Sequence, residues 1–180
     1  HLLGFDDFGR DILSRVLVGA RYTLGVALLA VSIGLIIGVT LGLLSGFYGS
    51  WIDTVSMRLI DTLMAFPYLL LAIVIVGVLG PGLNNAILAV GISAMPSYAR
   101  VTRATVLVLR ENDYVLAARA VGSTDGWIIT LHILPNALAP IIVVATVGMA
   151  QAILSAAGLS FLGLGAQPPT PEWGAMLSAG

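Results

Sequence analysis

Three long stretches without a charged residue dominate the pattern of polar and apolar positions along the chain. They cover 31 residues from Tyr22 to Ile52, 38 from Thr62 to Ala99, and 46 from Gly126 to Pro171. A helix needs about 20 apolar residues to cross a bilayer. The stretches therefore predict four membrane-spanning helices, at approximately 23–46, 62–79, 86–108 and 137–162.

Proline and glycine positions set the expected breaks between and within these helices. Pro67 lies inside the second predicted span, where neighbouring groups can satisfy the carbonyl that it leaves free. The uncharged segment 80–85 predicts a tight turn. Pro96 is expected to break the third span. The proline-rich tail 163–180 is expected to form an ordered loop outside the membrane rather than a helix.

Small residues repeat at helical spacing within the first predicted span. Gly34, Gly38 and Gly42 form two overlapping GxxxG patterns. In a membrane such residues allow two helices to approach closely. The pattern predicts tight helix packing, and packing within the chain fits it at least as well as dimerisation.

The composition excludes several classes of protein. Of the 180 residues 58% are hydrophobic and 9% are charged, whereas a soluble domain carries about 25% charged residues, so a soluble enzyme domain is nearly excluded. The net charge of −1 offers no basic face to nucleic acid. The charge-free spans argue against a membrane-embedded enzyme, and no Walker A loop is present for ATP.

The composition also leaves little material for a metal or catalytic site. The chain contains no cysteine, which excludes disulfides and a thiol nucleophile. Its two histidines, His1 and His132, have no partner at metal-ligand spacing. We expect no catalytic residue, no metal site and no cofactor bound by this chain.

The distribution of arginines predicts the membrane topology. Four of the eight arginines surround the segment 98–132, whereas the 80–85 turn and the 163–180 tail contain none. By the positive-inside rule, 98–132 lies in the cytoplasm and the other two segments lie outside. The same alternation places the N-terminal stretch outside, although it carries three arginines and so departs from the rule.

The polar interruption at 110–135 predicts a short helix, a turn and a second short helix. Asn112 or Asp113 can cap the first helix, Gly122 can end it in the left-handed conformation, and Ser123 can cap the second. Such a rigid knob suits the groove of a partner protein. An ordinary intracellular loop with an amphipathic helix is the alternative.

This loop has the spacing of a known motif. Its run is Leu116-Ala117-Ala118-x3-Gly122-x9-His132-x-Leu134-Pro135. The run resembles the EAA loop of permease subunits of type I ABC importers, whose pattern is Glu-Ala-Ala, three residues, Gly, nine residues, Ile, one residue, Leu-Pro. Leu116 replaces the Glu and His132 replaces the Ile, so a polar contact from the Glu position is in doubt.

Other segments resemble the dipeptide, oligopeptide and nickel branch of that family, so that the resemblance covers essentially the whole chain. These segments are His1–Gly4, Gly9–Arg15, Gly19–Arg21, Phe66–Pro67, Gly80–Gly82, Pro96–Arg100, Gly158–Gly165 and Gln167–Gly174. The resemblance implies an all-α, polytopic membrane helix bundle of the binding-protein-dependent ABC permease type, with a cytoplasmic EAA-like coupling-helix loop at 110–135. Because such subunits have six spans, we expect residues 1–180 to be a single transmembrane domain, a fragment that lacks the first and last spans.

The resemblance also implies a function. The chain would be a permease subunit that moves peptides or nickel across the cytoplasmic (inner) membrane of a prokaryote by alternating access. Residues 113–131 would couple it to separate cytoplasmic ATPase subunits that use the ATP, so the chain itself is not an enzyme. A second homologous permease subunit, an extracytoplasmic solute-binding protein and the lipid membrane are the other implied partners.

Two alternatives remain at this point. One is an importer of another small solute, such as glutathione. The other is an ATP-independent channel or a structural membrane protein. Residues that bind the transported solute are not identified by the sequence.

The candidate residues for the coupling site lie in the EAA-like loop. They are Tyr114, Leu116, Ala117, Ala118, Arg119, Gly122, Asp125, Leu134 and Pro135. Gly122 is expected to be both a helix C-cap and the hinge of the loop, and Arg119 is expected to be solvated or to face headgroups. Outside the loop, Asp61 is expected to be a helix-start charge close to Arg58 rather than part of a pathway.

Overall fold

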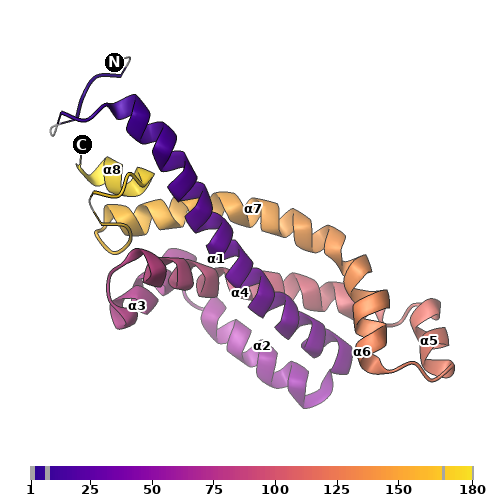
Figure 1. The fold of residues 1–180 in the computed structure, drawn as a ribbon. Coiled ribbons are helices and arrows are strands. Elements are labelled where there is room, and N and C mark those ends of the chain that lie inside the picture. The colour runs from indigo at the N-terminus through magenta and orange to yellow at the C-terminus, as the bar shows by residue number, and fades with distance from the viewer. Residues whose placement is uncertain (1–2, 7–8, 168, 180) are drawn as a thin grey trace. The chain divides into compact units, whose positions relative to one another are not determined.

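The chain is folded almost entirely into helices, as the sequence predicts. The computed structural model describes residues 3–6, 9–167 and 169–179, and no β-strand occurs among them (Figure 1). The helices are α1 Ile12–Tyr48, α2 Ser50–Met64, α3 Tyr68–Leu79, α4 Leu83–Leu109, α5 Asp113–Ala120, α6 Asp125–Ile128, the π-helix η1 Ile129–Ile133, α7 Leu134–Phe161 and α8 Trp173–Ala179.

Two helical stretches of the described chain are long and apolar enough to cross a membrane. They are Ile12–Tyr48 and Asp125–Phe161, which contain the predicted spans 23–46 and 137–162. Helices α2 and α3 meet the same criteria only as a pair, that is, as one broken span or as a re-entrant loop. Helix α4 covers the predicted span 86–108, whose crossing of the membrane stays a prediction.

Two expectations about proline need correction. The helix expected over 62–79 is broken, because α2 ends at Met64 and Pro67 caps α3 with φ −55° and ψ 136°. The residue before a proline is disfavoured in the α-helical conformation, which explains why the helix ends ahead of Pro67. Pro96, in contrast, lies inside a continuous α4. Its neighbours Met95 and Tyr98 are buried, so packing offsets a cost of about 3 kcal/mol for a proline within a helix.

The tail also differs from the expectation of a loop without a helix, because residues 173–179 form α8. The carboxylate of Glu172 accepts a hydrogen bond from the backbone N–H of Ala175 at 3.0 Å. This capping bond satisfies one of the donors that the first turn of a helix leaves free. Pro168 of the tail, like His1 and Leu2, lies outside the described residues.

The chain divides into two compact units, which alternate along the sequence. The first unit comprises residues 1–33, 67–93 and 148–180, and the second comprises 34–66 and 94–147. Each unit is described below by itself.

The first unit packs its helices through small residues. Its fully or nearly fully buried alanines include Ala27, Ala30, Ala72, Ala86, Ala89, Ala152 and Ala156. A Cβ atom built on Gly91 of α4 lies 2.8 Å from the carbonyl oxygen of Ala30 in α1. The turn predicted over 80–85 is shorter than expected, because α4 begins at Leu83 and only residues 80–82 separate it from α3. Asn85 Nδ2 donates to the carbonyl oxygens of Leu79 and Gly80 at 3.0 Å each.

The second unit uses the predicted glycine stripe in the same way. Cβ atoms built on Gly38 and Gly42 of α1 lie 2.6 Å from the carbonyl oxygens of Met95 and Ala99 in α4. One built on Gly46 lies 2.8 Å from Val106 Cβ. The stripe therefore brings α1 and α4 into direct backbone contact within this chain.

Candidate functional site

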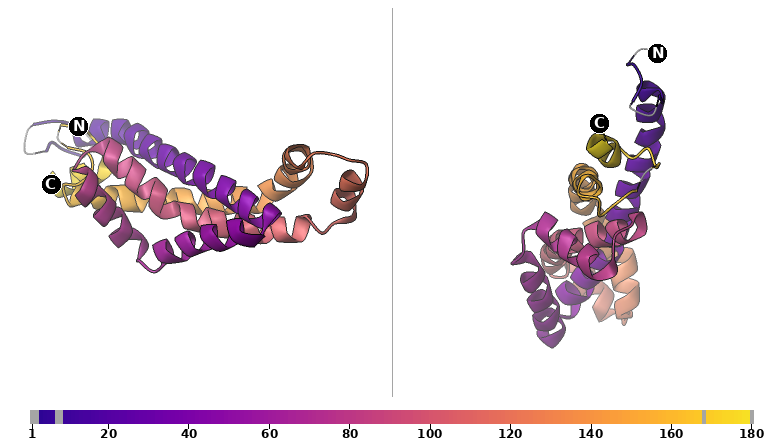
Figure 2. Two further views of the ribbon diagram at one scale, coloured as in Figure 1. Left: turned by 90° about the horizontal axis from the view of Figure 1, so that it is seen from below. Right: turned by 90° about the vertical axis from the view of Figure 1, so that its left-hand side faces the viewer.

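The loop between α4 and α7 rests on an apolar base. Val115 of α5, Ile128 of α6 and Ile133 of η1 are fully buried, and they form one cluster with Phe47 of α1 and Val106 of α4. Figure 2 shows α5 as a short helix joined to α6 by a loop at one end of the second unit. The cluster attaches both short helices to the ends of α1 and α4.

The turn between α5 and α6 is fixed by its hydrogen bonds and by Gly122. The N–H of Ser123 donates to the carbonyl of Ala118 and that of Gly122 to the carbonyl of Arg119, at 3.0 Å each. This is the Schellman pattern that ends a helix, and Gly122 has the left-handed φ of 84° that it requires. The predicted C-cap is thus confirmed. The N-cap of α6 is Thr124 rather than the predicted Ser123.

The opposite side of the loop is exposed and apolar. Tyr114 and Leu116 are 39% and 48% exposed, and Val121 in the turn is 83% exposed. Trp127 of α6 and Leu131 of η1 are also at least half exposed. The loop thus has a buried apolar base on one side and exposed apolar residues on the other. We call the exposed residues Tyr114, Leu116, Ala117, Val121 and Trp127 the outer surface.

The structure divides the predicted site residues between these two sides. Ala118 packs into the buried cluster and Leu134 packs against it, so neither belongs to the outer surface. The exposed candidates are Tyr114, Leu116, Ala117, Arg119, Gly122, Asp125 and Pro135. Helix geometry explains the difference between neighbours, because Ala117 and Ala118 point about 100° apart on α5.

Two aromatic contacts bind the loop further to its base. The guanidinium carbon of Arg119 lies 5.0 Å from the ring centroid of Phe47, within the range of a cation–π interaction. The rings of Tyr114 and His132 have centroids 6.1 Å apart and are tilted by 49°. Arg119 is exposed, as expected, but it also contacts the end of α1.

The helix that leaves the loop changes its hydrogen-bond register in front of Pro135. Residues 129–133 are π-helical, and the N–H of Leu134 donates to the carbonyl of Ile129, five residues back. Proline has no N–H for the α-helical bond. The Nδ2 of Asn136 donates to the carbonyl oxygen of His132 at 2.6 Å and so satisfies an acceptor in this turn. Short π-turns inside helices frequently lie at functional sites.

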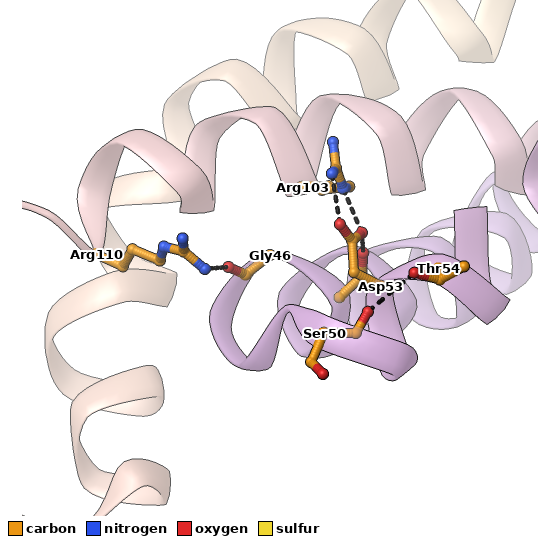
Figure 3. A network of polar contacts seen from close by, with 7 residues as sticks. Gly46, Ser50, Asp53, Thr54, Arg103 and Arg110 are labelled. Atoms are coloured by element: carbon orange, nitrogen blue, oxygen red, sulfur yellow. Dashed lines mark hydrogen bonds and ion pairs between the residues drawn. The ribbon is translucent and has the colours of Figure 1, made fainter.

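A polar network beside the loop joins α1, α2 and α4 (Figure 3). Arg103 donates from Nε and Nη2 to the two carboxylate oxygens of Asp53, at 2.5 and 2.6 Å, and Ser45 Oγ donates to the same carboxylate. Arg110 donates from Nη1 to the carbonyl oxygen of Gly46 at 2.9 Å. The bidentate geometry fixes the start of α2 against α4.

The sequence did not predict the partners of two further carboxylates, Asp61 and Glu172. Asp61 was expected to be a helix-start charge, but it lies near the end of α2, and its carboxylate accepts a hydrogen bond from Arg100 at 2.8 Å. Glu172 is 1% exposed, and the hydroxyl of Thr23 lies 3.5 Å from its carboxylate. Each pair joins residues far apart in the chain, so spacing alone carried no signal. For Glu172 the one hint in the sequence is that it directly follows the long charge-free stretch that ends at Pro171.

The described residues contain no group of three or more histidine, aspartate or glutamate side chains that is arranged to hold a metal ion. The charged side chains of the network instead pair with one another.

Comparison with known proteins relates the whole chain to one family. The family described as "Binding-protein-dependent transport system inner membrane component" matches residues 34–180. The dipeptide transport system permease protein DppC of Alkalihalophilus pseudofirmus is 55% identical over 99% of this chain. The glutathione transport system permease protein GsiD of Pectobacterium atrosepticum is 48% identical over the same share. The chain spans 59% of the length of each of these two relatives.

A solved structure supports the fold. The methionine ABC transporter MetNI, in inward-facing conformations, matches with a TM-score of 0.74 and 22% identity, over 86% of this chain and 77% of the other. At this identity the likeness concerns the fold alone.

Proposed function

Because this chain belongs to the family of binding-protein-dependent transport system inner membrane components, we propose that it is part of a permease subunit of an ATP-driven importer in a prokaryotic cytoplasmic membrane. Short peptides, including dipeptides and glutathione, are the proposed substrates, since the two relatives are named for dipeptide and glutathione transport. Nickel stays a prediction from the resemblance.

The single observation that carries the coupling role is the two-sided loop at 113–131. Its inner side is anchored to α1 and α4 through the buried cluster, and its outer side is exposed and apolar. A partner that grips the outer surface can therefore move the ends of two long helices together. The proposed partner is a cytoplasmic ATPase that performs the ATP hydrolysis, while this chain contributes the pathway.

The remaining partners follow from the same proposal. A second, homologous permease subunit would complete the pathway, and an extracytoplasmic solute-binding protein would deliver the substrate to its outer end. Alternating access would then consist of movements of the membrane helices driven from the loop. In this arrangement the chain holds no nucleotide.

Gly122 offers the sharpest test of the coupling role. A Cβ atom at this position meets no atom within 4 Å, so replacement by valine acts only through the positive φ, at a cost of about 1–2 kcal/mol. We expect Gly122→Val in the full-length protein to lower ATP-driven peptide uptake into vesicles while membrane insertion is unchanged.

Gly126 provides a matched control. It also has open space around its Cβ position, but it lies in α6 without a positive φ, so Gly126→Val should change uptake less. Normal uptake by Gly122→Val, or an equal loss in both variants, would contradict a coupling role for the α5–α6 turn.

A further inference from the structure

The first unit contains an open pocket of about 570 Å³ between α1 and the start of α4. Its polar lining is Arg21, Tyr22 and Asn84, and its apolar lining includes Val26, Leu29 and Ile87. The coupling role makes no use of this pocket. A pocket with a few polar groups at one end of an apolar surface is typical of a ligand site.

Arg21 brings an unpaired positive charge to the pocket. Of the three arginines in the N-terminal stretch, Arg10 and Arg15 lie 2.7 and 3.7 Å from the carboxylate of Asp6. Among the described residues, Arg21 has no hydrogen-bond or ion-pair partner, and no acidic residue lines the pocket. Of the three arginines on this stretch, Arg21 is therefore the one without a carboxylate contact among the described residues.

The N-terminus of α4 adds to the positive potential. Leu83 and Asn84 form the first turn of this 27-residue helix and line the same pocket. The first turn contains no acidic residue. Free backbone N–H groups and the helix dipole favour an anion at such a position.

The position of the pocket along α1 indicates which kind of anion it would bind. Arg21 directly precedes the charge-free stretch that begins at Tyr22, so the guanidinium lies where the apolar span begins. Tyrosine next to arginine is typical of the membrane–water interface. Further along α1 and α4 the pocket continues over apolar side chains, of which Leu29 is exposed and Val26 and Ile87 are buried.

We propose that this pocket binds an anionic phospholipid. The phosphate would accept hydrogen bonds from Arg21 and the first turn of α4, and an acyl chain would cover Val26, Leu29 and Ile87. Charge complementarity and the apolar continuation favour a lipid over a free phosphate or a peptide carboxylate, since these would use only the polar end. The proposal depends on the chain lying in a membrane and is independent of the coupling role of the loop.

Native mass spectrometry of the full-length protein in neutral detergent tests this, with phosphatidylglycerol, phosphatidylcholine and glycerophosphoglycerol (the headgroup without chains) as probes. We expect phosphatidylglycerol to bind the wild type, and Arg21→Gln to weaken this binding at least about tenfold, because a hydrogen bond to a charged group is lost. Arg21→Lys, which keeps the charge, should retain most of the binding. Arg58→Gln is the matched control, because Arg58 is also exposed but does not line the pocket.

Several outcomes would overturn the proposal. They are equal binding by wild type and Arg21→Gln, an equal loss in Arg58→Gln, and equal affinity for phosphatidylcholine. Binding of glycerophosphoglycerol as tightly as the lipid would identify a simple phosphate site. Displacement of the lipid by a dipeptide, dependent on Arg21, would identify a substrate site instead. Failure of phosphatidylglycerol to bind the wild type would also contradict it.

Discussion

The α5–α6 loop of the second unit and the α8 segment of the first unit are both short helical pieces held against long helices, but by different forces. The loop is held by the apolar cluster around Val115 and Ile128. Helix α8 is held by directional bonds. Trp173 Nε1 donates to the carbonyl of Val16 at 3.0 Å, and the backbone N–H of Trp173 donates to Thr23 Oγ1 at 3.3 Å.

The difference in force corresponds to a difference in what each segment leaves exposed. Apolar burial is not directional, so the loop can bury one side and still present Leu116 and Val121 on the other. Around α8 the fit is closer, because a Cβ atom on Gly174 would collide with the backbone of Ala157. The loop therefore keeps an exposed apolar side, whereas α8 is held closely on the side that it packs against α7.

The largest expected effect comes from the apolar anchor of the loop. Phe47 is 5% exposed and contacts both the cluster and Arg119. We expect Phe47→Ala to destabilise the second unit by about 3–5 kcal/mol, as in other large-to-small substitutions in a core. Unfolding of the full-length protein in detergent, together with hydrogen exchange of residues 113–128, measures this.

Tyr48→Phe is the control, because the Tyr48 side chain is 45% exposed and the substitution keeps the ring. It should leave both measurements unchanged. Unaltered hydrogen exchange of the loop in Phe47→Ala would show that the cluster is not what holds it.

An intermediate effect is expected from the polar network beside the loop. Asp53→Asn removes the charge that receives two hydrogen bonds from Arg103, and both side chains are less than one-third exposed. The expected loss is about 1–2 kcal/mol, below the value for a fully buried charged pair. Urea or thermal unfolding of the second unit measures it.

Asp61→Asn sharpens this result. Its ion pair with Arg100 leaves more than half of both side chains exposed, so its loss should cost less than about 1 kcal/mol. If the two variants are equally stable, burial does not distinguish the pairs and the Asp53 network is not what fixes α2.

The most local effect is expected at α8. Glu172→Ala removes the acceptor for the N–H of Ala175, at a cost of about 0.5–2 kcal/mol for a lost helix cap. Amide hydrogens at the start of α8 should exchange faster, while those of α5 are unchanged. Ser178→Ala, which removes only a bond to the carbonyl of Ala175, should have less effect. Faster exchange in both segments would mean that they are not held independently.

Local chemistry explains why the loop could be predicted from sequence. The left-handed stop at Gly122 and the two short helices depend on neighbouring residues, and the structure confirms them. The sequence did not predict which of the two alanines is buried. Ala117 and Ala118 are equivalent in the motif, and only the structure shows that Ala118 belongs to the buried cluster.

Long-range pairing explains most of what could not be predicted. Asp53 and Arg103 are 50 residues apart, and Thr23 and Glu172 are 149 apart. Spacing in the sequence does not encode which helices meet. Pro67 and Pro96 gave the same local signal, yet the first lies at a helix break and the second lies in a continuous, buried helix.

The glycine contacts between α1 and α4 have one further consequence. The backbone of α4 at Gly38 and Gly42, and mainly the side chain of Val106 at Gly46, leave no space for a methyl group on these glycines. Sliding the two helices past each other by one residue would bring a bulkier side chain into each of these contacts. Over these residues the close contact therefore opposes sliding between α1 and α4, and we expect a displacement of one of these two helices to move the other with it.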